Sequence, residues 1–239
     1  MNGSHHAWLS PAVGRPMHVR WFGRGGARVI AFPSSWGTHD EWPDRHMPEV
    51  LGEHIARGWL TLFCVDANHD ESWYEKRIPP AERARGQLRY DAYLRDELLP
   101  FTAHIDPTPF VIATGASFGA YHAACFAFRN PHLVQRLIGM SGVYDIRSLT
   151  DGYSDEWIYQ VNPAEFMRNE SDASRLDAFR RQDLILAVGR DDPNYHDNAQ
   201  LSALLWEKGI GNALRTWDGW SHDWPFWERM IQLYIGGHD

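Results

Sequence analysis

The sequence is poor in cysteine, in basic charge and in long apolar runs. Two cysteines in 239 residues cannot build a disulfide framework, and both lie in apolar stretches, so we expect two buried free thiols. The formal net charge of −8 argues against a nucleic-acid partner, which requires a positive surface. No apolar run approaches the roughly 20 residues that cross a bilayer, so we expect no membrane partner.

Targeting patterns are also missing from the start of the chain. Residues 1–10 contain no basic segment followed by an apolar run, which is the pattern of a secretory signal. We therefore expect a cytoplasmic protein. The sequence leaves open whether the chain forms a homo-oligomer.

Metal and nucleotide motifs are absent as well. No histidine–cysteine cluster has the spacing of metal ligands. The glycines at 23–26 stand between two predicted strands and not before a helix, so they do not form a phosphate loop. Asp66, Asp70 and Glu71 are spaced too widely for a typical site for a hard cation. The sequence therefore predicts neither a cofactor nor a metal.

The chain does have the composition and periodicity of one α/β domain. Hydrophobic residues make up 44% and charged residues 23%, as in globular proteins. Short apolar runs alternate with stretches of helical periodicity, which predicts parallel strands joined by helices in a doubly wound sheet. The predicted strands are 17–22, 28–32, 60–65, 110–113, 137–140, 184–188 and 214–217, and the predicted helices are 47–57, 81–105, 118–128, 197–208 and 224–234.

Two segments depart from this alternation. Strands 17–22 and 28–32 are joined by glycines at 23–26, which predicts an antiparallel N-terminal hairpin. Residues 142–181 form the longest irregular segment, which is too short for a domain and has the length of a small cap or lid. We expect a single domain over 1–239 with this insertion.

One motif suggests a nucleophile. Residues 115–119 read Gly-Ala-Ser-Phe-Gly and match G-x-S-x-G. The motif directly follows an apolar strand and directly opens a helix, which is the setting of a nucleophile elbow. Glycines on either side keep Cβ atoms out of a crowded turn. Ser117 is therefore the predicted nucleophile, and an ordinary serine in a tight turn is the alternative.

The general base is expected after the last strand. Among thirteen histidines, His222 alone directly follows the strand predicted at 214–217. A histidine there can take the proton of a serine hydroxyl. His122 lies inside the helix that follows Ser117, and we expect it to be structural.

The triad acid is expected after the strand at 184–188. Two aspartates occur there, and the spacing from the strand favours Asp192 over Asp191, which stays an alternative. The order Ser117, Asp192, His222 is that of an α/β-hydrolase.

Backbone amides and aromatic side chains complete the predicted site. We expect the oxyanion donors to be the amides of Phe118 and Ser35, with Ser34 as the alternative to Ser35. Several tryptophans lie in predicted loops at the ends of strands where ligands bind. We expect Trp36, Trp73 and Trp220 to contact a bulky acyl or aryl group of a small-molecule ester.

Several of these motifs together resemble a known family. The matching residues are 10–17, the motif at 115–119, Ser141-Gly142 with Tyr144-Asp145, and His222-Asp223-Trp224 with Trp227. They resemble the esterase D-like branch of α/β-hydrolases, which includes S-formylglutathione hydrolase, feruloyl esterases and antigen 85. Residues 32–35, 64–66, 71–74 and 222–225 look closer to a bacterial subgroup of that branch. Pro33-Ser34 replaces the His-Gly that is common before the oxyanion residue.

The resemblance implies ester hydrolysis as the reaction class. Together with the motifs, it predicts a serine carboxylic-ester hydrolase that acts through an acyl-enzyme on Ser117. An acyltransferase that uses the same acyl-enzyme is one alternative. A non-catalytic binding protein on a hydrolase scaffold is the other.

Overall fold

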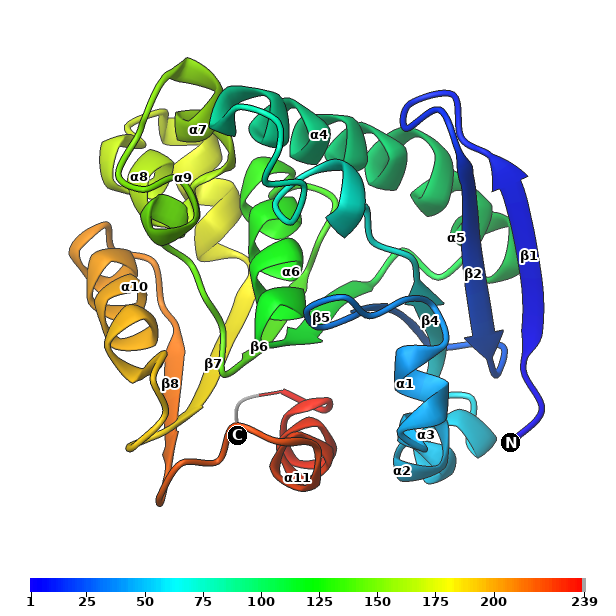
Figure 1. The fold of residues 1–239 in the computed structure, drawn as a ribbon. Helices are drawn as coiled ribbons and strands as arrows, with labels where there is room; N and C mark the ends of the chain where they lie inside the picture. The colour runs from blue at the N-terminus through cyan, green and yellow to red at the C-terminus, as the bar shows by residue number, and fades with distance from the viewer. Residues whose placement is uncertain (238–239) are drawn as a thin grey trace.

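The computed structural model describes residues 1–237 and contains one eight-stranded sheet between two layers of helices (Figure 1). The strands are β1 (Ser4–Leu9), β2 (Pro16–Phe22), β3 (Ala27–Phe32), β4 (Leu60–Val65), β5 (Val111–Ala116), β6 (Arg136–Met140), β7 (Asp183–Gly189) and β8 (Ala213–Trp217). Their spatial order is β1-β2-β4-β3-β5-β6-β7-β8. Strands β3 to β8 run parallel, and β2 is antiparallel to both of its neighbours. The α/β-hydrolase fold is thereby confirmed.

The N-terminal hairpin is present, but its strands differ from those predicted. β1 pairs with β2, whereas β4 lies between β2 and β3, so the predicted pairing of 17–22 with 28–32 is wrong. The glycine loop at 23–26 instead leads the chain past the end of β4. A Cβ at Gly26, where φ is +76°, would lie 2.0 Å from the carbonyl oxygen of Trp59. The glycine serves close packing against β4 and not a hairpin turn.

The helices follow the predicted pattern with several subdivisions. They are α1 (Glu41–Asp44), α2 (Met47–Val50), α3 (Gly52–Ala56), η1 (His69–Glu71), α4 (Pro80–Tyr93), η2 (Leu94–Leu98), α5 (Leu99–Ile105), α6 (Phe118–Arg129), η3 (Ile146–Leu149), α7 (Glu156–Val161), α8 (Pro163–Asn169), α9 (Ala173–Arg180), α10 (Tyr195–Glu207) and α11 (Trp224–Tyr234). The helix predicted over 81–105 is divided by the π-helical turn η2, just before Pro100. Proline lacks the N–H that a regular helix would use there.

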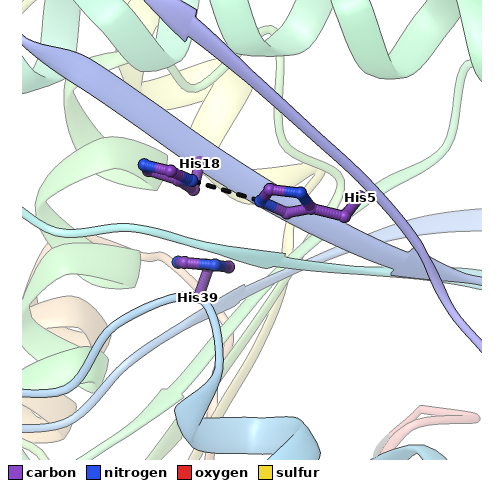
Figure 2. Close-up of side chains that lie close together, drawn as sticks. All are labelled: His5, His18 and His39. Carbon is purple, nitrogen blue, oxygen red and sulfur yellow. Dashed lines mark hydrogen bonds between the residues drawn. The ribbon is translucent and has the colours of Figure 1, made fainter.

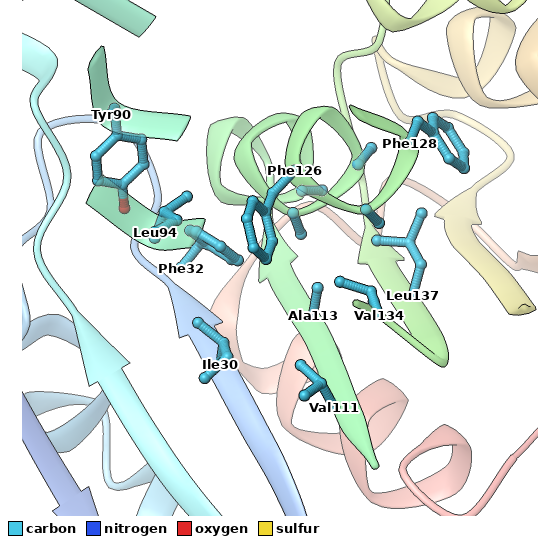
Figure 3. Packing of buried hydrophobic residues seen from close by; sticks show 14 of the residues in the cluster. Ile30, Phe32, Tyr90, Leu94, Val111, Ala113, Phe126, Phe128, Val134 and Leu137 are labelled. Atoms are coloured by element: carbon cyan, nitrogen blue, oxygen red, sulfur yellow. The ribbon is translucent and has the colours of Figure 1, made fainter. Parts of the chain in front are cut away.

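Side chains alternate across the sheet and build a core on each face. On β3, Ile30 and Phe32 point to the face covered by α4 and α6, where Figure 3 shows them packed with Tyr90 and Phe126. The alternating Val29 and Ala31 contribute to the core on the opposite face, under α2 and α11. Each large apolar side chain buried in this way stabilises the fold by about 1.5–3 kcal/mol. The two cores hold the carboxyl ends of the strands rigidly in place.

The segment 142–181 contains the short helices η3, α7, α8 and α9. Ile146 and Ile158 from this segment join a separate apolar cluster with Phe118 and Tyr121 of α6. The segment therefore lies beside the first turn of the helix that follows Ser117.

Two further expectations concern buried and apolar parts of the chain. Cys64 and Cys125 are both free and buried, as expected, and burial raises the pKa of the Cys125 thiol to about 12. Such a thiol stays protonated at neutral pH and is a poor nucleophile. Among residues 1–237, no helix is both long and apolar enough to cross a bilayer.

Candidate active site

Ser117 lies between the end of β5 and the first residue of α6, where the chain turns sharply. Its backbone adopts φ 54° and ψ −118°, a conformation that L-residues rarely adopt. A Cβ on Gly119 would lie 2.6 Å from the carbonyl oxygen of Phe32, and one on Gly115 would lie 2.3 Å from the Gly119 carbonyl carbon. Both glycines of the motif are therefore required by close backbone approach, as its pattern predicted.

The structure brings Ser117, His222 and Asp192 into one hydrogen-bonded chain. His222 Nε2 lies 3.2 Å from Ser117 Oγ. On the other side of the ring, His222 Nδ1 lies 2.9 Å from Asp192 Oδ1 and 3.0 Å from Oδ2. The three residues follow β5, β7 and β8, because the carboxyl ends of these parallel strands meet at one edge of the sheet.

Asp192, and not Asp191, faces the imidazole. The Asp192 side chain is 0% exposed, whereas Asp191 is exposed and its amide donates to the Gly219 carbonyl. Burial raises the pKa of Asp192, but the hydrogen bonds from His222 and from the Asn194 amide outweigh it and leave that pKa below its usual value. The carboxylate therefore stays ionised at neutral pH and can hold the Nδ1–H tautomer.

Ser141 links the loops that follow β6, β7 and β8; it matched the family pattern in the sequence, but no role was predicted for it. Its hydroxyl accepts a hydrogen bond from Trp227 Nε1 at 3.1 Å and lies 3.5 Å from the Ser221 carbonyl oxygen, which it faces as a donor. Its carbonyl accepts from Asn194 Nδ2 at 2.9 Å. The signal in the sequence was its place directly after a predicted strand. In the structure its backbone has φ 53°. Ser141 thus fixes the loop that carries Asp192 against the one that carries His222.

The segment after β3 lies against the first turn of α6, because a Cβ on Gly119 would lie 2.7 Å from the Pro33 carbonyl oxygen. The Ser34 amide and hydroxyl both donate to the carboxylate of Glu41, so this amide is occupied. Within the described part of the chain, the Ser35 amide donates to no other group. The Phe118 amide, at the first position of α6, has no intrahelical acceptor. These two amides are the candidate oxyanion donors.

Glu41 is a half-buried carboxylate for which the sequence analysis predicted no role. Burial raises its pKa above the usual value, and the hydrogen bonds from Ser34 oppose that rise only in part. A Cβ on Gly37 would lie 2.7 Å from the Glu41 carboxylate. Glu41 therefore holds the 34–37 turn in one conformation.

The predicted aromatic contacts are divided between surface and core. Trp36 is 63% exposed and stacks on Tyr74, with ring centroids 4.5 Å apart. Trp220 is 52% exposed, and its ring centroid lies 5.6 Å from that of His222. Trp73 is fully buried against Tyr121, so its predicted contact with substrate is not available in this structure. Apolar neighbours on α4 and α6 draw Trp73 into the core.

His122 is buried, as expected for a structural residue. Its ring packs on Phe118, with centroids 5.0 Å apart, and on His69 at 5.2 Å. Neither histidine reaches Ser117 through a hydrogen bond within the described residues, and the His122 ring has no hydrogen-bond partner there.

Comparisons with known proteins agree with this architecture. A family model described as "Putative esterase" matches residues 62–231. An S-formylglutathione hydrolase from Agrobacterium tumefaciens has a TM-score of 0.76 at 13% identity, over 98% of this chain and 93% of the other. A ferulic acid esterase has a TM-score of 0.74 at 15% identity, over 97% and 95% of the two chains.

A third solved structure, a fluorophosphonate-binding serine hydrolase of Staphylococcus aureus, has a TM-score of 0.71 at 14% identity, over 99% and 98% of the two chains. No curated protein sequence matches the chain. At such low identities the structural matches show the fold, and the family match adds the class of activity. The chain belongs to this esterase family of α/β-hydrolases and is an enzyme that hydrolyses esters.

Proposed function

We propose that the protein hydrolyses carboxylic esters through an acyl-enzyme on Ser117, with His222 as general base and Asp192 as the residue that orients it. The observation that supports this proposal is the continuous chain of contacts at 3.2 and 2.9 Å from Ser117 Oγ through the imidazole to a buried carboxylate. A serine hydroxyl needs such a base before it can attack a carbonyl carbon.

In the first half of the reaction, Ser117 Oγ bonds to the ester carbonyl carbon while its proton passes to His222 Nε2. The Phe118 and Ser35 amides donate to the oxygen that becomes negative. The imidazolium then gives its proton to the leaving alcohol as the C–O bond of the ester breaks. Asp192 stays ionised throughout and stabilises the charged ring.

In the second half, water replaces the alcohol. His222 Nε2 takes a proton from water as the water oxygen attacks the acyl carbon, and it returns that proton to Ser117 Oγ when the acyl group leaves as a carboxylic acid. The same groups act in both halves, so each depends on the position of one imidazole.

The exposed aromatic rings support a substrate with an aryl or other bulky group. Trp220 beside His222 and the stacked pair Trp36–Tyr74 beside Ser35 provide flat apolar surfaces on two sides of the site. We also propose that residues 142–181 act as the cap, because Ile146 and Ile158 pack on the cluster that contains Phe118.

Replacing Ser117 with alanine tests the nucleophile. We expect Ser117→Ala to abolish turnover of p-nitrophenyl acetate and covalent labelling by a fluorophosphonate probe, while Ser4→Ala, an exposed control in β1, keeps both. Equal labelling of wild type and Ser117→Ala would rule out this nucleophile. A screen of acyl and aryl esters, with intact-mass detection of the trapped acyl-enzyme, then defines the substrate class.

A further inference from the structure

Three histidines from separate elements lie together at the N-terminal edge of the sheet. His5 comes from β1, His18 from β2, and His39 from the loop between β3 and α1 (Figure 2). One ring nitrogen from each lies within 4.8 Å of those of the other two. The closest pair is His5 Nε2 and His18 Nδ1, at 3.1 Å. Imidazole nitrogens gathered in this way are the ligands that zinc and its neighbours in the first transition series prefer.

The backbone holds the three residues in this arrangement. In the β1–β2 ladder, His5 is opposite Arg20 and His18 is opposite Ala7, so the two histidines are diagonal neighbours on one face. The His18 amide donates to Asp66 Oδ2 at 2.8 Å, and the His39 amide donates to Asp66 Oδ1 at 3.0 Å. The buried Asp66 therefore joins the hairpin to the loop that carries His39.

Asp66 also orients the His39 ring. Its Oδ1 lies 2.7 Å from His39 Nδ1, which favours the tautomer with the proton on Nδ1. In that tautomer the electron pair of Nε2 is available to a metal. A carboxylate that holds the far nitrogen of a histidine is a recurrent feature of protein metal sites, because it fixes the tautomer and raises the basicity of the ligand. Asp40 Oδ2 lies 3.4 Å from the same Nε2, while Arg20 occupies Asp40 Oδ1 at 2.7 Å.

Small side-chain rotations would complete the coordination geometry. The three rings are nearly parallel, with interplanar angles of 13° to 26°, so their nitrogens do not yet face one point. Zinc–nitrogen bonds of about 2.0–2.1 Å in a tetrahedron place two ligand nitrogens roughly 3.4 Å apart. His5 Nε2 and His18 Nδ1, at 3.1 Å, are already near that spacing, so metal binding would require the His5 and His18 rings to turn about their Cβ–Cγ bonds toward the His39 ring, which Asp66 holds in place.

We propose that His5, His18 and His39 bind one divalent transition-metal ion, for which zinc has the best-matched ligand set, with Asp40 Oδ2 or water as the fourth ligand. The nitrogen-rich ligand set excludes calcium and magnesium, which take oxygen ligands. The inference is independent of the proposed esterase mechanism, which uses none of these residues.

The ion would link the N-terminal hairpin to the catalytic side of the molecule. A cavity of about 440 Å³ is lined by His18, His39 and Asp66 and also by Trp36. His39 and Trp36 belong to the same short loop, which also carries Ser35. A metal held by all three histidines would therefore fix this loop to β1 and β2.

Metal titration of the chelator-treated protein tests the site. We expect isothermal titration with Zn²⁺ to give one ion per chain, and Co²⁺ to give the visible absorption bands of a four-coordinate ion with nitrogen ligands. His39→Ala and His18→Ala should each weaken Zn²⁺ binding by roughly 100-fold or more, and Asp66→Asn by roughly 10-fold. Circular dichroism of each variant checks that the fold is retained.

His6→Ala is the matched control. His6 adjoins His5 on β1, but its ring stacks on Phe101, at 5.2 Å, on the other face of the hairpin. Zn²⁺ affinity should be unchanged in His6→Ala and in Ser117→Ala. Wild-type affinity in folded His39→Ala and His18→Ala would overturn the proposal. So would an equal loss in His6→Ala, because the loss of affinity would then not depend on the three clustered rings.

Discussion

His222 and the pair His69–His122 have surroundings that differ in the two respects that matter for catalysis, hydrogen-bond partners and burial. His222 has a partner on each ring nitrogen and is 18% exposed, so it can exchange protons with substrate and solvent. His69 and His122 are buried among aromatic rings, and the His122 ring has no hydrogen-bond partner within the described residues. Burial lowers the pKa of His69 to about 4 and that of His122 well below its usual value. A histidine with hydrogen-bond partners and access to solvent can act as a base, whereas a histidine buried among apolar rings stays neutral and serves packing.

Substitution of the two kinds of histidine should give the largest contrast. His222→Ala removes the proposed base, and we expect kcat/KM for p-nitrophenyl acetate to fall by about 10³-fold or more. His122→Phe keeps an aromatic ring in the same packing position, and kcat/KM should stay within a few-fold of wild type. A loss of tenfold or less in His222→Ala would reassign the base.

The partner of His222 can be tested in the same way. Asp192→Asn keeps the shape of the side chain but removes the charge that holds the imidazole, so kcat should fall by about 10³–10⁴-fold with little change in KM. Asp191→Asn, one position earlier and exposed, should leave kcat unchanged. Similar losses in both variants would show that the loop as a whole, and not the Asp192 charge, supports catalysis.

The buried histidines should instead affect stability in acid. The folded-state pKa of His69 is about 4, below its unfolded value of about 6.5, so the unfolded chain binds the proton more readily between these values. The free energy of unfolding should therefore fall as the pH drops from 6.5 to 4, by about 3 kcal/mol from this residue. Asp192, whose pKa is lowered, adds its own loss only below about pH 4.

Urea denaturation at several pH values measures this effect. His69→Phe removes the titrating group but retains an aromatic ring, so its stability should decline less steeply than that of wild type between pH 6.5 and 4. His222→Ala serves as control, because its ring is not buried without partners. A decline in His69→Phe as steep as in wild type would assign the acid sensitivity to other groups.

Much of the fold could be predicted because the central strands are buried on both faces. β4 and β5 are buried along their whole lengths, and five of the six residues of β4 are apolar, which stands out in the sequence. β1 was missed because it is an exposed edge strand that begins with polar residues and shows no apolar alternation. The predicted pairing of β2 with β3 was wrong because strand order depends on tertiary packing, which places β4 between them.

In the candidate site too, residues marked by local sequence features could be predicted, and residues that act through tertiary contacts could not. Ser117 and His222 were named from a motif and from chain order, which are local features of the sequence. Glu41 and Tyr74 contact the 34–36 turn through side chains from other elements, and no local pattern indicates such contacts. The histidine cluster escaped notice for the same reason, because its three members come together only when the sheet forms.

The positive φ of Ser117 has a consequence for the energy of the whole molecule. A side chain in this backbone conformation costs about 1–3 kcal/mol, whereas glycine adopts it freely. Ser117→Gly should therefore unfold at a higher urea concentration than Ser117→Ala, although both lack the hydroxyl. The position of the Ser117 hydroxyl therefore lowers the free energy of unfolding of the wild-type chain relative to a variant with glycine at this position.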